Sequence, residues 1–275
     1  MVYNIKLLVG EVMKSNILEI SKLNYNDIFH NFNIGIKKNS FTVIAGKNNS
    51  GKTMLLKILS GLIMTKKSVK YKDGYLEETP KNIVYKDIAV MFFDNLIYFD
   101  DITVEDHLFS ILENIKSKNK IITYQDIINL LDISSILSKS VRELSFFDKS
   151  KVVLASILLT SPKVILIDDV CLGLDKSEAE IFLNILHEIN KTKVTIVVTT
   201  NNLEYSIGSD YICIIHDGNV SLEGKPGDIL MLDNNINKLG LNVPFMYDLS
   251  VKLRDYNLTQ DIELDIERLV DTLWK

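Results

Sequence analysis

The stretch AGKNNSGKTM, residues 45–54, decides the fold of this chain. From Gly46 to Thr53 it fits the pattern G-x-x-x-x-G-K followed by Ser or Thr, and it follows the apolar run FTVIA at residues 41–45. This pattern predicts a strand, a loop whose backbone N–H groups curl around a phosphate, and a helix. The two glycines permit the close approach of backbone to anion, and the positive N-terminus of the helix faces the phosphate.

The same loop supplies a cation and a metal ligand. Lys52 can reach the terminal phosphates of a nucleotide, and the Thr53 hydroxyl can bind Mg²⁺. The apolar run VILIDDV at residues 164–170 predicts a strand that ends in Asp168, whose carboxylate can hold the same ion. We therefore predict Thr53 and Asp168 as Mg²⁺ ligands. The predicted nucleotide-binding residues are Gly46, Lys47, Asn48, Asn49, Ser50, Gly51, Lys52, Thr53 and Met54.

Composition limits the class of protein. The chain has 275 residues, of which 47% are apolar, and this suits one large α/β domain with an appendage. A net charge of −5 without a long basic stripe argues against nucleic acid as a partner. Cys171 and Cys213 show no disulfide or metal spacing, which indicates a reducing compartment. No apolar run approaches the roughly 18 residues of a membrane span, so we expect a cytoplasmic protein.

Short apolar runs alternate with helical patterns, which predicts a largely parallel sheet. The predicted strands are 17–23, 41–45, 88–93, 163–168, 193–199 and 210–215, and the predicted helices include 52–62, 149–160 and 176–190. Asp217-Gly218 indicates a hairpin between two apolar segments. Two apolar helical faces are expected to pack on the body of the protein. The first lies on the helix 176–190 and consists of Ile181, Phe182, Ile185, Leu186 and Ile189. The second lies near the end of the chain and consists of Ile266, Leu269, Val270 and Leu273.

A longer segment places these motifs in a family. RELSFFDKSKVVLASILLTSPKVILIDDVCLGLD, residues 142–175, resembles the signature, helix, Walker B strand and D-loop of an ATP-binding cassette (ABC) ATPase. Ser145 matches the signature serine, and Asp175 matches the D-loop aspartate. TIVVTTNN at residues 195–202 falls where the family has the strand of its switch histidine. This resemblance implies ATP and Mg²⁺ as cofactors.

The C-terminal residues indicate which type of ABC ATPase the chain resembles. EGKPGDIL (223–230), LGLNVPFMYDLSVKLRDYNL (239–258) and DIERLVDTL (265–273) resemble the C-terminal extension of the ATP-binding subunits of energy-coupling factor (ECF) importers. The implied fold is a RecA-like α/β P-loop core with an antiparallel β subdomain, an inserted helical subdomain and a small helical C-terminal extension. The expected divisions are a possible N-terminal extension at 1–13, with Met13 as an alternative start, the nucleotide-binding domain at 14–235 with its helical part near 100–150, and the extension at 236–275.

The resemblance also implies an assembly. Family members form head-to-tail dimers with two ATP molecules between the subunits, so Ser145 would contact the γ-phosphate bound to a partner. The implied partners are a second ABC ATPase subunit, a transmembrane coupling protein and a substrate-binding membrane component. The chain would then lie on the cytoplasmic face of the membrane and drive uptake of a vitamin or metal ion. Residues 96–99 are either core or an apolar patch for a membrane partner.

Four family positions are altered. Asp169 replaces the catalytic glutamate and is one methylene shorter, although a base must lie within about 3.2 Å of its water. Asn201 replaces the switch histidine, and Phe93 replaces the Q-loop glutamine. The signature reads Leu-Ser-Phe-Phe-Asp at 144–148 and lacks both glycines. We expect nucleotide binding with weak hydrolysis and favour a heterodimer.

The ring that stacks on adenine and the function of the chain also stay open at this stage. Tyr25 and Phe29 flank the position at which the family stacks a tyrosine on adenine, and either ring could instead be core. The alternative functions are a catalytically inactive regulatory or structural subunit that binds nucleotide, and an ATPase subunit of another ABC transporter class.

Overall fold

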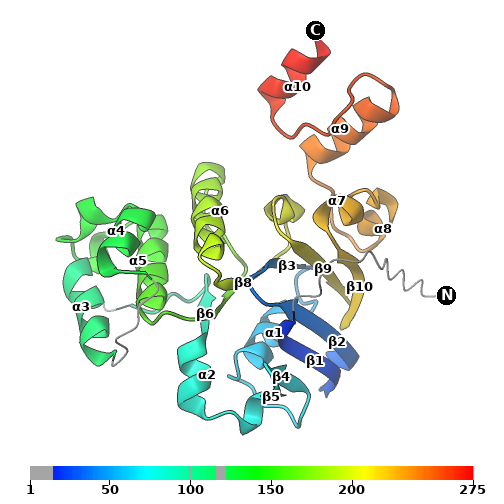
Figure 1. The fold of residues 1–275 in the computed structure, drawn as a ribbon. Helices are drawn as coiled ribbons and strands as arrows, with labels where there is room; N and C mark the ends of the chain where they lie inside the picture. Colours follow the sequence, from blue (N-terminus) through cyan, green and yellow to red (C-terminus); the bar gives the residue numbers. More distant parts are fainter. Residues whose placement is uncertain (1–14, 99–100, 116–121, 275) are drawn as a thin grey trace.

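The computed structural model describes residues 15–98, 101–115 and 122–274 (Figure 1). The predicted N-terminal extension, residues 1–13, and Phe99 lie outside these ranges. The described part contains a six-stranded sheet, a four-stranded sheet, a lobe of helices between β6 and β7, and a helical segment after β10.

The six-stranded sheet has the order β10-β9-β3-β8-β7-β6. Its strands are β3 (Phe41–Ala45), β6 (Ile88–Phe92), β7 (Val164–Asp168), β8 (Thr195–Thr200), β9 (Tyr211–His216) and β10 (Asn219–Gly224). All neighbours are parallel except β10, which pairs antiparallel with β9. The predicted parallel sheet is confirmed. The predicted hairpin is also confirmed, because Asp217 and Gly218 have the positive φ values of 46° and 68° that such a turn needs.

Both faces of this sheet are covered, which is why its central strands are continuous apolar runs. One face packs against α1 (Lys52–Leu59) and the four-stranded sheet, and the other packs against α5 (Phe146–Leu159) and α6 (Lys176–Lys191). Every residue of β3 is buried. On α6, Phe182, Leu186 and Ile189 are buried as predicted, whereas Ile181 is 48% exposed and lies outside the packed face.

The four-stranded sheet is antiparallel with the order β2-β1-β4-β5. Its strands are β1 (Asn16–Tyr25), β2 (Phe29–Lys37), β4 (Val69–Tyr71) and β5 (Gly74–Tyr75). The sequence predicted β1 as a segment but none of the other three. In β2 the polar residues His30, Asn31 and Asn33 break up the apolar pattern, and the β1–β2 register shifts at three points.

The helical lobe lies apart from the four-stranded sheet in Figure 1. It consists of α3 (Val104–Asn114), α4 (Tyr124–Leu131) and the start of α5, with short 3₁₀ turns at Ser134–Ile136 and Val141–Glu143. Thr103 and Thr123 cap α3 and α4 by accepting backbone hydrogen bonds. Two further elements connect the sheets: α2 (Lys81–Asp87) and the 3₁₀ turn Leu76–Glu78.

The C-terminal segment is helical, as predicted. It comprises α7 (Pro226–Leu230), α8 (Asp233–Lys238), α9 (Phe245–Asp255) and α10 (Ile266–Leu273), and α9 and α10 extend away from the sheets in Figure 1. The expectation that the α10 stripe packs on the body is wrong. Leu269 is buried, but Ile266, Val270 and Leu273 are 62%, 44% and 40% exposed, because α10 extends beyond the two sheet layers.

Candidate nucleotide-binding site

The predicted phosphate loop connects β3 to α1, which begins at Lys52. Gly46 cannot carry a side chain, because a Cβ there would lie 2.6 Å from the carbonyl oxygen of Ile215. Gly51 has a φ of 98°, and Asn49 has a φ of 65°, a region that asparagine adopts more readily than most residues. The sequence therefore places residues with suitable backbone freedom where the loop turns.

The ammonium group of Lys52 lies inside this loop. Its Nζ donates to the carbonyl oxygens of Gly46 and Lys47, both at 2.9 Å, and the residue is 5% exposed. Burial lowers the pKa of Lys52, while the carboxylates of Asp169 and Asp168 act in the opposite direction. The loop therefore holds a buried cation whose two partners are uncharged carbonyl oxygens, and an anion can replace them.

Two acidic residues follow one another at the end of β7. Asp168 is 3% exposed, and its Oδ1 accepts a hydrogen bond from the Thr199 hydroxyl at 2.7 Å. The N–H of Asp169 donates to the same hydroxyl oxygen at 2.8 Å. Burial raises the pKa of the Asp169 carboxyl, with further upward contributions from Asp168 and Asp94 and an opposing one from Lys52. Thr199 was not predicted from the sequence.

Thr53 and Asp168 are chemically suited to Mg²⁺. A hydroxyl and a carboxylate are hard oxygen donors, and Mg²⁺ is commonly held by one or two protein groups together with phosphate oxygens and waters. Across residues 15–98, 101–115 and 122–274, no cluster of three or more His, Cys, Asp or Glu side chains could hold a metal. The donor set thus fits an ion that arrives with a nucleotide.

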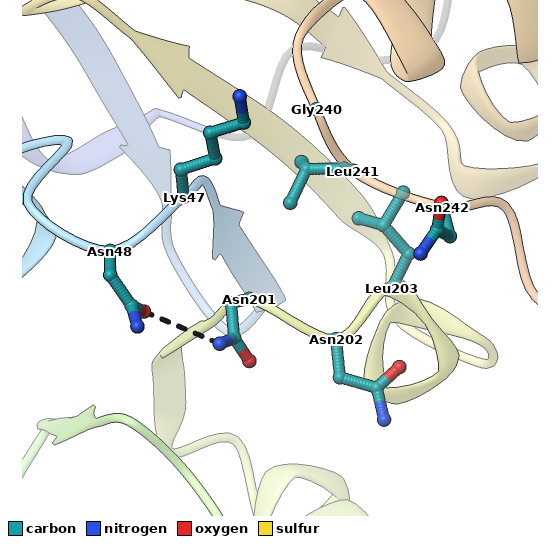
Figure 2. Close-up of a pocket in the computed structure, with 8 residues that line it drawn as sticks. All are labelled: Lys47, Asn48, Asn201, Asn202, Leu203, Gly240, Leu241 and Asn242. Atoms are coloured by element: carbon teal, nitrogen blue, oxygen red, sulfur yellow. Dashed lines mark hydrogen bonds between the residues drawn. The ribbon is translucent and has the colours of Figure 1, made fainter.

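Asn201 lies beside the phosphate loop. Its Nδ2 donates to Oδ1 of Asn48 at 3.3 Å, and Figure 2 shows both side chains at the edge of a pocket of about 530 Å³. The residues that line this pocket are Lys47, Asn48, Asn201, Asn202, Leu203, Gly240, Leu241 and Asn242. The structure therefore brings the predicted switch position together with the phosphate loop.

The loop at 240–242 belongs to the C-terminal segment and was missed by sequence reasoning. The backbone of Gly240 lies so close to the Lys47 side chain that a Cβ on Gly240 would lie 1.6 Å from Lys47 Cε. Gly240 also has a φ of 69°, which glycine adopts easily. Gly240 follows α8, and a glycine at the end of a helix carries no information about distant contacts, so no local signal connects it with residue 47.

The signature position is separate from that pocket. Ser145 is the N-cap of α5: its Oγ accepts from the N–H of Asp148 at 3.0 Å and donates to the Asp148 carboxylate at 3.1 Å. Lys151 pairs with the same carboxylate at 3.0 Å. Asp175 has a comparable structural role, because it caps α6 by accepting from the N–H of Glu178 at 2.9 Å. Both side chains thus begin helices.

Phenylalanine rings connect two of the altered positions, residue 93 and the signature. Phe93 is 1% exposed and makes edge contacts with Phe146 at 6.2 Å and with Phe182 at 5.1 Å between ring centroids. The Phe146 ring also covers Gly173, where an added Cβ would meet it at 3.3 Å. Phe93 is therefore a core residue, and the exposed Asp94 is the polar group next to it.

Two open points receive structural answers. Phe29 is fully buried and packs against Phe32 with ring centroids 4.8 Å apart, so it belongs to the core. Tyr25 is half-buried at the end of β1. In the segment that follows Phe93, Leu96 and Tyr98 pack partly against the core, whereas Ile97 is 79% exposed.

A phosphate loop between β3 and α1, acids at the end of β7 in the same parallel sheet, a separate antiparallel sheet and an inserted helical lobe define an ATPase of the ABC class. Residues 29–171 match the ABC transporter family. The ECF transporter ATP-binding protein EcfA1 of Mesomycoplasma hyopneumoniae (strain J) is 32% identical over 255 residues, which cover 90% of this chain and 91% of the relative. The corresponding protein of Ureaplasma parvum is 31% identical and covers 90% and 86%. The chain belongs to the ABC transporter family, among the ECF-type ATP-binding subunits, whose members couple ATP hydrolysis to transport.

Solved structures agree on the fold. CbiO1 of Clostridium perfringens, part of the ABC transporter complex CbiONQ, superposes with a TM-score of 0.71 at 23% identity, covering 82% of this chain and 95% of that one. An ATP-binding cassette dimer in a post-hydrolysis state gives a TM-score of 0.62 at 18% identity, covering 76% and 98%. The predicted fold class is therefore confirmed. Among the described residues, no helix has the length and apolar character needed to cross a membrane.

Proposed function

We propose that this chain binds Mg-ATP at an interface with a second ABC ATPase subunit and thereby drives uptake of a vitamin or metal ion through membrane partners. The observation that carries the proposal is the phosphate loop with Lys52 buried inside it, close enough to Asp168 and Asp169 for charge coupling. The names of the sequence relatives support the ECF type of transporter.

Binding begins with an exchange of partners at Lys52. The terminal phosphates replace the carbonyl oxygens of Gly46 and Lys47 as acceptors from Nζ, which gives the buried ammonium a charged partner. The N–H groups of the loop and the start of α1 hold the phosphate oxygens. Thr53 and Asp168 would hold Mg²⁺, which would supply positive charge to offset that of the phosphates.

Hydrolysis by the site of this chain is weak in our proposal. Asp169 has a shorter side chain than the family glutamate, and Asn201 can donate a hydrogen bond but carries no charge. The raised pKa of the Asp169 carboxyl makes it a better proton acceptor once it is ionised, and the lost methylene still sets it back from its water. Asp169 and Asn201 are the residues on which any turnover by this site depends.

The signature surface, with which this chain would contact the ATP bound by the second subunit, is also altered. Ser145 would meet the γ-phosphate bound by the second subunit, but its hydroxyl already donates to Asp148. Phe146, which stands where the family signature has a glycine, is 41% exposed, and its ring covers Gly173. These features favour a heterodimer in which the second subunit has the more complete set of catalytic groups.

The remaining partners are membrane proteins. Ile97, which follows the buried Phe93 by four residues, is 79% exposed and is a suitable apolar contact for a transmembrane coupling protein. A separate membrane component would bind the transported substrate, so the chain would reside at the cytoplasmic face of the membrane. We propose no nucleic-acid partner.

The test measures Mg-ATP binding and ATP turnover with and without a candidate second ATPase subunit. The variants are Lys52→Ala and, as a matched control, Lys66→Ala, which removes an exposed lysine beyond the end of α1. The proposal expects binding that requires Lys52 but not Lys66, and turnover that appears only with the partner. Brisk turnover by the isolated chain would contradict the weak-hydrolysis part.

The same experiment separates the alternatives. Binding without turnover in every combination would favour a regulatory or structural subunit. Turnover stimulated by the membrane subunits of a different transporter would favour another ABC class. No binding at all would overturn the proposed function.

A further inference from the structure

We infer that Thr199 is a positioning residue for the Mg-ATP site, through a hydroxyl group that connects Asp168 with Asp169. The inference rests on the proposed function, because it concerns the metal that would accompany ATP. Thr199 lies on β8, two residues before Asn201. It belongs to the stretch 195–202 that was compared with the switch-histidine strand, but no role was assigned to it from the sequence.

The geometry begins where β7 leaves the sheet. β7 and β8 pair in parallel from Val164 with Thr195 to Ile167 with Val198, and beyond this point β7 turns away. At this point Thr199 accepts hydrogen bonds from two consecutive N–H groups. Its carbonyl oxygen accepts from the N–H of Val170 at 2.9 Å, and its hydroxyl oxygen accepts from the N–H of Asp169 at 2.8 Å. One residue thus fixes the backbone of the turn after β7.

The single hydroxyl proton of Thr199 is directed to the metal ligand. It is donated to Oδ1 of Asp168 at 2.7 Å, and this hydrogen bond sets the rotation of the carboxylate. Oδ1 is thereby held by the protein, which leaves Oδ2 as the oxygen for the ion. A hydrogen bond to a ligating carboxylate orients it and tunes its affinity for the metal.

Burial makes this hydrogen bond difficult to replace. Thr199 is 0% exposed and Asp168 is 3% exposed, so water cannot easily supply a donor if the hydroxyl is removed. The hydroxyl also holds Asp169 at a φ of 44°, a left-handed conformation that L side chains rarely adopt. A valine would match the shape of Thr199 and lose both hydrogen bonds.

The test compares Thr199→Val with Thr199→Ser, which keeps the hydroxyl, and with Thr195→Val as a matched control. Thr195 is also fully buried on β8, and its hydroxyl accepts from the N–H of Asn39 at 2.9 Å, at the opposite end of the strand. ATP affinity is measured in EDTA and then as a function of Mg²⁺ concentration. Binding of Mn²⁺ to the ATP complex is followed by electron paramagnetic resonance, and urea midpoints report stability.

We expect Thr199→Val to raise the Mg²⁺ and Mn²⁺ concentrations needed for half-maximal binding about tenfold, as loss of a ligand-orienting partner commonly does. ATP affinity in EDTA should stay the same, because the contacts of the phosphate loop are intact. Thr199→Ser should restore the metal dependence of the wild type. If the valine protein does not fold, Thr199→Cys, with its weaker donor, should give a smaller shift in the same direction.

Three results would overturn the inference: an unchanged metal dependence in Thr199→Val, an equal shift in Thr195→Val, or a failure of serine to restore the wild-type value. A lower urea midpoint shared by both valine variants, without a metal effect, would mean that Thr199 is only structural. If the wild type binds ATP in a Lys52-dependent manner but shows one of these results, the positioning role alone fails. If the wild type binds no ATP, the proposed function fails as well.

Discussion

Asp87 offers a quantitative test of how the two sheets are joined. It lies at the end of α2, and its Oδ2 accepts from the Tyr71 hydroxyl at 2.6 Å, Lys163 Nζ at 2.7 Å and Lys72 Nζ at 3.0 Å. Tyr71 belongs to the four-stranded sheet, and Lys163 immediately precedes β7 of the six-stranded sheet. Replacing Asp87 with asparagine therefore weakens a contact between the two layers.

The expected loss in free energy of unfolding depends on how exposed the side chains of this contact are. The Asp87 side chain is 6% exposed, but those of Lys72 and Lys163 are 44% and 49% exposed, so water can solvate both lysines after the change. Hydrogen bonds to charged groups contribute about 1.5–3 kcal/mol, and solvent-exposed ion pairs about 0–1 kcal/mol. Asparagine still offers an oxygen to Tyr71. We expect Asp87→Asn to lower the free energy of unfolding by about 1–2 kcal/mol at pH 7.

The stability that Asp87 contributes should decrease only towards low pH. Burial acts to raise the pKa of Asp87, but hydrogen bonds from Lys163, Tyr71 and Lys72 outweigh it, and the pKa is lowered below its ordinary value of 3.8. A lowered pKa stabilises the folded state above the unfolded pKa, and this contribution disappears as the pH falls through the folded pKa. The difference between wild type and Asp87→Asn should stay constant from pH 8 to about 5.

Urea denaturation followed by circular dichroism measures this difference, and Asp73→Asn removes a nearby exposed carboxylate as the control. Asp73→Asn should change the free energy of unfolding by less than about 0.5 kcal/mol. Equal effects of the two changes, or a difference that already disappears between pH 7 and pH 5, would refute the reasoning.

Further predictions concern catalysis and turn geometry. Asp169→Glu restores the missing methylene and should raise steady-state ATP turnover measured with the partner subunit, by at most about 10²–10⁴-fold; an unchanged rate would mean that side-chain length is not limiting. Changing Phe146 and Phe147 together to glycine should raise the turnover of the partner's site, and an unchanged rate would show that the rings do not obstruct the signature. Gly218→Ala should lower the free energy of unfolding by about 2 kcal/mol or more, measured by urea denaturation, because a Cβ there would lie 1.8 Å from a backbone carbonyl oxygen at a φ of 68°. Gly74→Ala, which meets nothing within 4 Å, should be nearly neutral, and equal losses would contradict the steric argument.

The strands that could be predicted are those with covered faces. β3, β7 and β8 are buried along their whole length, so their sequences are continuous apolar runs with a clear start and end. β2 has one solvent-facing side and irregular register, and β4 and β5 have three and two residues. Such strands exist because a neighbouring strand pairs with them, and this pairing leaves little periodicity in the sequence.

Packing decided which apolar residues belong to the core. The apolar residues of α10 do repeat at helical spacing, so the predicted helix is present. An apolar stripe is buried only where another element covers it, however, and most of this stripe is exposed. Leu269 has such a cover and Ile266 does not. In the same way, the resemblance places Phe93 where the family has its Q-loop glutamine, and the ring contacts with Phe146 and Phe182 make it part of the core.

The sequence by itself determined the phosphate loop, the acid at the end of β7 and the α/β class, because each depends on residues that are adjacent in the chain or repeat at the period of a helix or strand. Only the tertiary structure decided that Thr199 connects Asp168 and Asp169, that Asn201 meets Asn48, and that Gly240 lies against Lys47. These contacts join segments from about 30 to nearly 200 residues apart. They arise from the order of strands in the sheet and from the path of the C-terminal segment, which no local pattern encodes.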